Sequence, residues 1–149
     1  MRKLTLALLA ALPMMAQAST VKIDDWYYSS RIDPITDEDS SMALTQDGKG
    51  GAIGIHCNNG EPMVVPSSGQ YLGSNQDLPV TWRVDDSQPV TKSLPVIDSF
   101  VVMPNSVMED MATGQKIIIR FTDYRQRQYT HTFSLRGFYD ATGLLSCVD

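Results

Sequence analysis

The chain has 149 residues, of which 42% are hydrophobic and 19% are charged, with 12 basic side chains against 17 acidic ones. This acidic balance argues against a nucleic-acid-binding protein, because such a protein needs a basic face for the phosphates. The length is that of one domain with its own core.

The first 18 residues have the pattern of a secretory signal peptide. Two basic residues, Arg2 and Lys3, precede an apolar run, and a small-x-small cleavage site ends at Ala18. Cleavage there leaves residues 19–149, with ten basic side chains against 17 acidic ones and a net charge of −7. We therefore expect a periplasmic protein, and no later stretch is apolar and long enough to predict a membrane span.

The rest of the chain is dominated by a hydrophobic period of two, which is typical of strands with one buried face. Asn58-Asn59-Gly60 lies between two such patterns and predicts a hairpin turn, because Asn-Gly tolerates positive φ. Strict alternation marks 51–59, 78–86, 115–123 and 127–137, and further strands are expected at 26–31, 41–46, 62–66, 90–94 and 99–103.

Two short segments interrupt this pattern. Residues 105–114 begin with a capping Asn or Ser and end at Gly114, which predicts about two helical turns. In the tail at 137–147, Phe138, Ala141, Leu144 and Leu145 share one helical face. Many strands with one or two short helices predict a mostly-β fold, an antiparallel β-sandwich or a partly open barrel, as one domain over residues 19–149.

An acidic segment, RIDPITDEDSS, follows the first expected strand. Asp33, Asp37, Glu38 and Asp39 lie within seven positions. Three interpretations are open: a calcium site formed by Asp33, Asp37 and Asp39, an acid/base pair, or a turn with solvated acids that face a partner. No HExxH, CxxC or EF-hand spacing is present, so we expect neither a metal nor a cofactor. We expect Asp33 or Asp37 to bind backbone amides or a basic side chain such as Arg83.

The C-terminal third carries a cluster of basic residues, with only Asp123 as an acid among them. Its members are Lys116, Arg120, Arg125, Arg127 and Arg136. They form either solvated strand faces or a cationic patch for an acidic partner. The candidate partner-binding residues are therefore Asp33, Asp37, Glu38, Asp39, Arg120, Arg125 and Arg127.

The chain has two cysteines, Cys57 and Cys147, and an exported protein with an even count is expected to pair them. Cys57 shares the apolar face of its strand with Ile53 and Ile55, so the bridge would pin the tail across the core. Closing a loop of 90 residues is worth roughly 4–5 kcal/mol in chain-entropy models.

The two histidines do not suggest a catalytic set. His56 and Cys57 are adjacent on a strand and point to opposite faces, so a thiol–imidazole pair is not expected. His131 shares a face with Tyr129 and Phe133 and is expected to be packed and hydrogen-bonded. Trp26 or Tyr28 is expected in the core. We therefore expect no enzymatic activity, with no catalytic residues, and an envelope hydrolase using the acidic segment is the remaining enzymatic alternative.

Several features occur in an order that resembles a known family. They are Trp26, the Pro and acids of 33–39, the strand and turn of 52–61 with its cysteine, the Val-Thr-Trp-Arg-Val-Asp strand of 80–85, and Tyr124 followed by 132–137 and Cys147. In this order the chain is similar to the periplasmic type VI secretion-associated proteins called VasI or TagO. The resemblance implies a periplasmic accessory role without catalytic residues.

The function expected from the sequence is therefore that of an exported, non-enzymatic binding protein that contacts an envelope or type VI secretion-related protein. The alternative is an inhibitor or immunity-type protein that blocks a toxin or a cell-wall enzyme, since a small, acidic, disulfide-braced domain suits a basic enzyme cleft.

Overall fold

The computed structural model describes residues 19–148, so the predicted signal peptide at 1–18 lies outside the described residues. The described part contains ten strands and two short helices. Their bounds are β1 (Ser19–Ile23), β2 (Trp26–Ser30), β3 (Met42–Gln46), β4 (Ala52–Asn58), β5 (Glu61–Ser67), β6 (Gly73–Val84), β7 (Val90–Asp98), β8 (Phe100–Val101), α1 (Val107–Thr113), β9 (Lys116–Thr122), β10 (Gln128–Ser134) and α2 (Phe138–Thr142).

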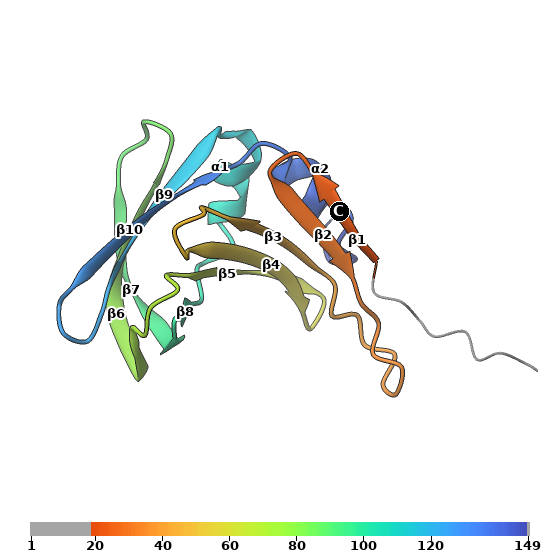
Figure 1. Cartoon of the computed structure of the whole chain (residues 1–149), viewed down its shortest axis with the longest axis horizontal. Coiled ribbons are helices and arrows are strands. Elements are labelled where there is room, and N and C mark those ends of the chain that lie inside the picture. Colours follow the sequence, from red (N-terminus) through yellow and green to blue (C-terminus); the bar gives the residue numbers. More distant parts are fainter. Residues whose placement is uncertain (1–18, 149) are drawn as a thin grey trace, which may run out of the picture.

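All ten strands belong to one open antiparallel sheet, in the order β1-β2-β3-β4-β5-β8-β7-β6-β9-β10. Figure 1 shows that this sheet bends, so that β6, β7, β9 and β10 stand across the layer formed by β3, β4 and β5. The expected mostly-β, antiparallel fold with two short helices is confirmed. The bend gives the single sheet the two-layered character of a sandwich.

The core lies inside this bend and follows from the alternation in the sequence. On β9 the side chains of Ile117, Ile119 and Phe121 are buried, whereas Arg120 is exposed. The same pattern continues on β10, where His131 and Phe133 are buried. Burying one side of each strand in this way supplies the main favourable term of folding.

The two ends of the sheet approach each other around Trp26. This side chain is fully buried, as expected for Trp26 or Tyr28. Its indole N–H donates to the carbonyl oxygen of Ser134 on β10 at 3.1 Å. The ring also packs edge-on against Phe138 of α2, with 5.1 Å between ring centroids. Helix α2 thereby covers β2 and β3, as Figure 1 shows, and the Trp26 indole on β2 binds β10 at the far edge of the sheet.

The expected disulfide is present between Cys57 at the end of β4 and Cys147 in the tail, with 5.7 Å between the two Cα atoms. The expected hairpin is confirmed as well, since Asn58 pairs with Glu61 and leaves Asn59 and Gly60 as a two-residue turn. Both turn residues have positive φ, 53° and 80°, as the tightest hairpin turns require.

Several elements differ from the sequence expectation. Strand β1 was not expected, and it pairs with β2 along its whole length. The strand expected at 99–103 is reduced to β8, because the chain leaves the sheet after Val101 on its way to α1 and only Met103 forms a further bridge, to Val64.

The tail helix is also shorter than expected. Helix α2 ends at Thr142, next to Gly143, so the chain turns before Leu144 and leaves that side chain exposed while Leu145 is buried. Within residues 19–148 neither helix is long and apolar enough to cross a membrane.

Candidate functional site

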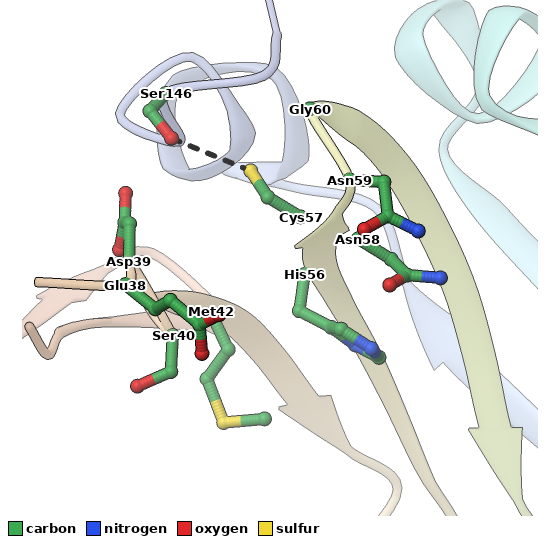
Figure 2. Close-up of a pocket in the computed structure, with 10 residues that line it drawn as sticks. All are labelled: Glu38, Asp39, Ser40, Met42, His56, Cys57, Asn58, Asn59, Gly60 and Ser146. Carbon is green, nitrogen blue, oxygen red and sulfur yellow. Dashed lines mark hydrogen bonds between the residues drawn. The ribbon is translucent and has the colours of Figure 1, made fainter. Parts of the chain in front are cut away.

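A pocket of about 610 Å³ lies between the acidic segment and the β4–β5 hairpin, beside the disulfide (Figure 2). This volume is in the range of small-ligand and side-chain binding sites. Its lining residues are Glu38, Asp39, Ser40, Met42, His56, Cys57, Asn58, Asn59, Gly60 and Ser146.

The acidic segment is held in shape by Asp33. One carboxylate oxygen of Asp33 accepts the backbone N–H groups of Ile35 at 2.8 Å and Thr36 at 2.9 Å. Hydrogen bonds from these amides, first that of Thr36, hold the pKa of Asp33 below its ordinary value. The expectation that Asp33 or Asp37 binds backbone amides is therefore confirmed for Asp33. The suggested partner Arg83 lies elsewhere, on β6.

Asp39 closes the other end of the segment. Its carboxylate accepts the backbone N–H of Ser41 at 2.8 Å, and its backbone forms a bridge with Ile32. The Ser41 side chain and amide, together with the Ser146 hydroxyl, lower the pKa of Asp39. Asp39 is therefore ionised at neutral pH, and its carboxylate forms part of one wall of the pocket.

The four acids do not act as one cluster. Glu38 and Asp39 line the pocket, whereas Asp33 is occupied in the turn and Asp37 lies exposed at the tip with a φ of 58°. Among residues 19–148 no group of three His, Cys, Asp or Glu side chains is placed to hold a metal ion. The geometry thus presents two carboxylates on one wall, with the other two acids outside it.

The opposite wall comes from the end of β4 and its turn. His56 lies directly across from Met42 in the β3–β4 register, so both side chains stand on the outer face of these strands. Figure 2 shows His56, Asn58 and Asn59 at the end of β4 and its turn, across the pocket from the loop segment that carries Glu38 and Asp39. Sequence reasoning did not propose His56 or Asn58 as site residues, although the alternation that turns Cys57 inward also turns His56 outward.

The tail forms the third side of the pocket. The Ser146 hydroxyl lies 3.6 Å from the Cys57 sulfur, as the dashed line in Figure 2 marks. Because the neighbouring Cys147 is bonded to Cys57, the tail is fixed against the end of β4. The disulfide therefore joins two walls that are about 90 residues apart in the sequence and preorganises the pocket.

The chemistry of this arrangement is that of a binding site for a hydrogen-bond donor or a cation. Two carboxylates and two amides provide acceptors, and the apolar Met42 forms part of the lining. Within the described residues no hydrogen bond is found between His56 and Glu38, Asp39 or Ser146.

The basic candidates lie far from this pocket and do not form one patch. Arg127 donates through Nε to Asp123 at 2.7 Å and stands over the Tyr129 ring, with its side chain exposed. Arg125 stacks on Tyr124 in the turn, at 5.0 Å from the ring centroid. Arg120 instead stands on the outward side of β9.

Comparisons with known proteins bear on the fold. No protein-family model matches the chain, and no curated protein matches it either. Among solved structures the chain is similar to invasion associated protein B from Bartonella henselae, with a TM-score of 0.62 and 13% sequence identity. The match covers 85% of this chain and 94% of that one. At this identity the likeness supports the mostly-β fold alone.

Proposed function

We propose that this chain is an exported, non-enzymatic binding protein of the bacterial envelope that receives a basic side chain or segment of another envelope protein in the pocket beside the disulfide. The observation that carries the proposal is the pocket itself, in which Glu38 and Asp39 face His56 and the hairpin amides across about 610 Å³. A pair of neighbouring carboxylates attracts a cation and fixes its position through charge-assisted hydrogen bonds.

Three further observations support the export and partner aspects. The first 18 residues have the signal-peptide pattern, and the described part has a disulfide, which is the bond expected in an oxidising compartment. The resemblance to the VasI/TagO proteins, which rests on several sequence features that occur in the same order, favours a type VI secretion-related partner.

A site-specific photo-crosslinker tests the proposal in the native periplasm. Placed at Asn59, on the rim of the pocket, it should yield a discrete crosslink to an envelope protein, whereas the same group at Lys49, on the β3–β4 turn, should not. Glu38→Gln should reduce the yield at Asn59, and the matched control Glu109→Gln on α1 should leave it unchanged. Recovery of no envelope protein at Asn59, or of the same proteins from both positions, would overturn the proposal.

The second candidate is an inhibitor or immunity-type protein that inserts the acidic segment into a basic enzyme cleft. The feature that favours it is the exposed loop at 34–38, stiffened at its two ends by Asp33 and Asp39. Titrating the purified chain against the toxins or cell-wall enzymes encoded beside its gene distinguishes the two. Stoichiometric inhibition that is lost when Asp37 and Glu38 become amides would favour the inhibitor.

A further inference from the structure

A second surface lies on the outer face of β6, β7, β9 and β10, away from the core. The registers place Thr91, Thr81, Arg120 and Thr130 in one row across these four strands. Within the row, the two threonine hydroxyls on β6 and β7 lie 2.8 Å apart, and Arg120 Nε donates to the Thr130 hydroxyl at 3.4 Å. The Thr130 hydroxyl therefore helps to orient the Arg120 guanidinium.

The neighbouring row carries a second arginine. Arg83 lies opposite Ile118 in the β6–β9 register, and its side chain is half-buried. A hollow of about 390 Å³ opens between the two arginines, with Pro89 and Ile118 among its apolar lining residues. We call Arg83, Lys116 and Arg120, with Thr81 and Thr130, the arginine face.

The charges of the arginine face form no ion pair with any residue of the described range 19–148. In the described residues neither Arg83 nor Arg120 lies within 4.0 Å of a carboxylate oxygen, whereas Arg127 and Arg136 both form ion pairs. The nearby Asp85 is occupied, because its carboxylate accepts the backbone N–H groups of Gln115 and Lys116 at 3.0–3.1 Å. A cationic surface therefore persists on a chain whose overall charge is negative.

The spacing of the two arginines matches an extended chain. Arg120 lies opposite Thr81, two positions from Arg83, so the two arginines are diagonal neighbours with Cβ atoms roughly 7 Å apart. In an extended peptide, side chains on one face repeat about every 6.6–6.8 Å. Carboxylates at alternate peptide positions thus meet the two guanidinium groups one by one, each in the bidentate geometry that arginine favours.

We propose that the arginine face binds an extended acidic segment of a protein partner, with carboxylates at positions i and i+2 on Arg83 and Arg120. The proposal goes beyond the function proposed above, because the acid-walled pocket plays no part in it. An anionic membrane is a poorer match: lipid-binding clusters carry more basic residues than the three here, and the acidic remainder of the chain would be repelled from such a surface.

The test uses a synthetic peptide with glutamates at alternate positions among serines and threonines, and a control peptide with glutamines in their place. The acidic peptide should bind the full chain with an affinity that falls as salt rises, and the control peptide should not bind. Each of Arg83→Gln and Arg120→Gln should weaken binding about tenfold, which corresponds to losing one charge-assisted pair. Lys49→Gln, a matched charge change on the β3–β4 turn, should leave the affinity within about twofold.

Three outcomes would overturn the proposal. The first is no binding of the acidic peptide at about 1 mM. The second is an equal loss of peptide affinity from Lys49→Gln and from the arginine variants. The third is arginine-dependent binding to vesicles of phosphatidylglycerol and phosphatidylcholine without binding to the peptide. Arg83→Lys and Arg120→Lys serve as second variants, because they keep the charge and the fold while losing the planar fork. Their affinities should lie between those of the native chain and the glutamine variants. Failure here leaves the crosslink at Asn59 unaffected, so the two proposals are tested separately.

Discussion

His131 Nδ1 lies 2.6 Å from Asp47 Oδ2, and this contact joins the β3–β4 turn to β10, 84 residues further along the chain. Both side chains are almost fully buried, at 8% and 2% exposed. Because β10 is the last strand in the order of the sheet, the contact fastens the edge of the sheet to the opposite layer. The imidazole also stacks on Phe133, so His131 is the packed, hydrogen-bonded histidine that its position predicted.

Replacing Asp47 with Asn should destabilise the fold. The carboxylate accepts the backbone N–H groups of Lys49 at 2.8 Å and Gly51 at 3.0 Å in addition to the imidazole contact. We expect Asp47→Asn to lower the free energy of unfolding at neutral pH by about 1–3 kcal/mol, measured by urea denaturation. Asp86→Asn, at an exposed turn position, is the matched control. An equal effect of both variants would contradict a stabilising role of the Asp47 carboxylate.

The contact between Asp47 and His131 also predicts that the stability of the fold depends on pH. Burial raises the pKa of Asp47, but hydrogen bonds from His131 and from the amides of Lys49 and Gly51 outweigh it, so the pKa lies below its ordinary value of 3.8. The ionised carboxylate therefore stabilises the fold above that value, and this stabilisation is lost as the pH falls through the lower pKa of the folded state. Between about pH 6 and pH 3 the melting temperature of the native chain should fall further than that of Asp47→Asn. If the melting temperatures of the two proteins fell in parallel with pH, the ionised Asp47 carboxylate would not be the source of this stabilisation.

Gly51 should not tolerate a side chain. A Cβ at this position would collide with the imidazole of His131 and displace it from Asp47. We expect Gly51→Ala to cost about 1–3 kcal/mol in the free energy of unfolding, as overpacking commonly does. Gly54→Ala is the control, because its Cβ would meet its nearest neighbour at an ordinary 3.8 Å, and its stability should change by about 0.5 kcal/mol or less.

The disulfide should account for a large share of the stability. Removing the Cys57–Cys147 bond with a paired Cys→Ser substitution should lower the free energy of unfolding by up to roughly 4–5 kcal/mol, because the denatured chain regains a loop of 90 residues. Thermal melts with and without reductant check this on the native chain, and reductant should not affect the paired variant. Equal melting temperatures of the native chain under both conditions would show that the bond contributes nothing.

Asp33 should order the acidic segment locally. Asp33→Ala removes the acceptor of the Ile35 and Thr36 amides, so both amides should exchange with deuterium faster. Asp33→Asn keeps an acceptor oxygen and should restore most of the protection. Glu38→Gln should leave both amides unchanged, since Glu38 lines the pocket and is exposed. Unchanged protection in Asp33→Ala would show that the backbone alone maintains the turn.

Local patterns were enough to predict much of the fold. Alternation identified the strands of the core because each strand buries one face, as Val80 and Trp82 do on β6. The Asn59-Gly60 turn was predictable because few residues adopt positive φ cheaply. The pairing of Cys57 with Cys147 followed from their number and the expected compartment. Strand β1 was missed because it is short and directly follows the expected cleavage site, and its side chains are almost all exposed.

The sequence by itself therefore determined which face of the core strands is buried, where the chain turns, and that Asp33 or Asp37 binds backbone amides or a basic side chain. Only the tertiary structure decided which distant faces meet. It placed His56 across from Glu38 and Asp39, and it set Arg83 beside Arg120 while turning Arg127 to Asp123. The physical reason is that alternation fixes the side on which a residue stands, whereas the register between strands far apart in the chain depends on how their buried faces pack.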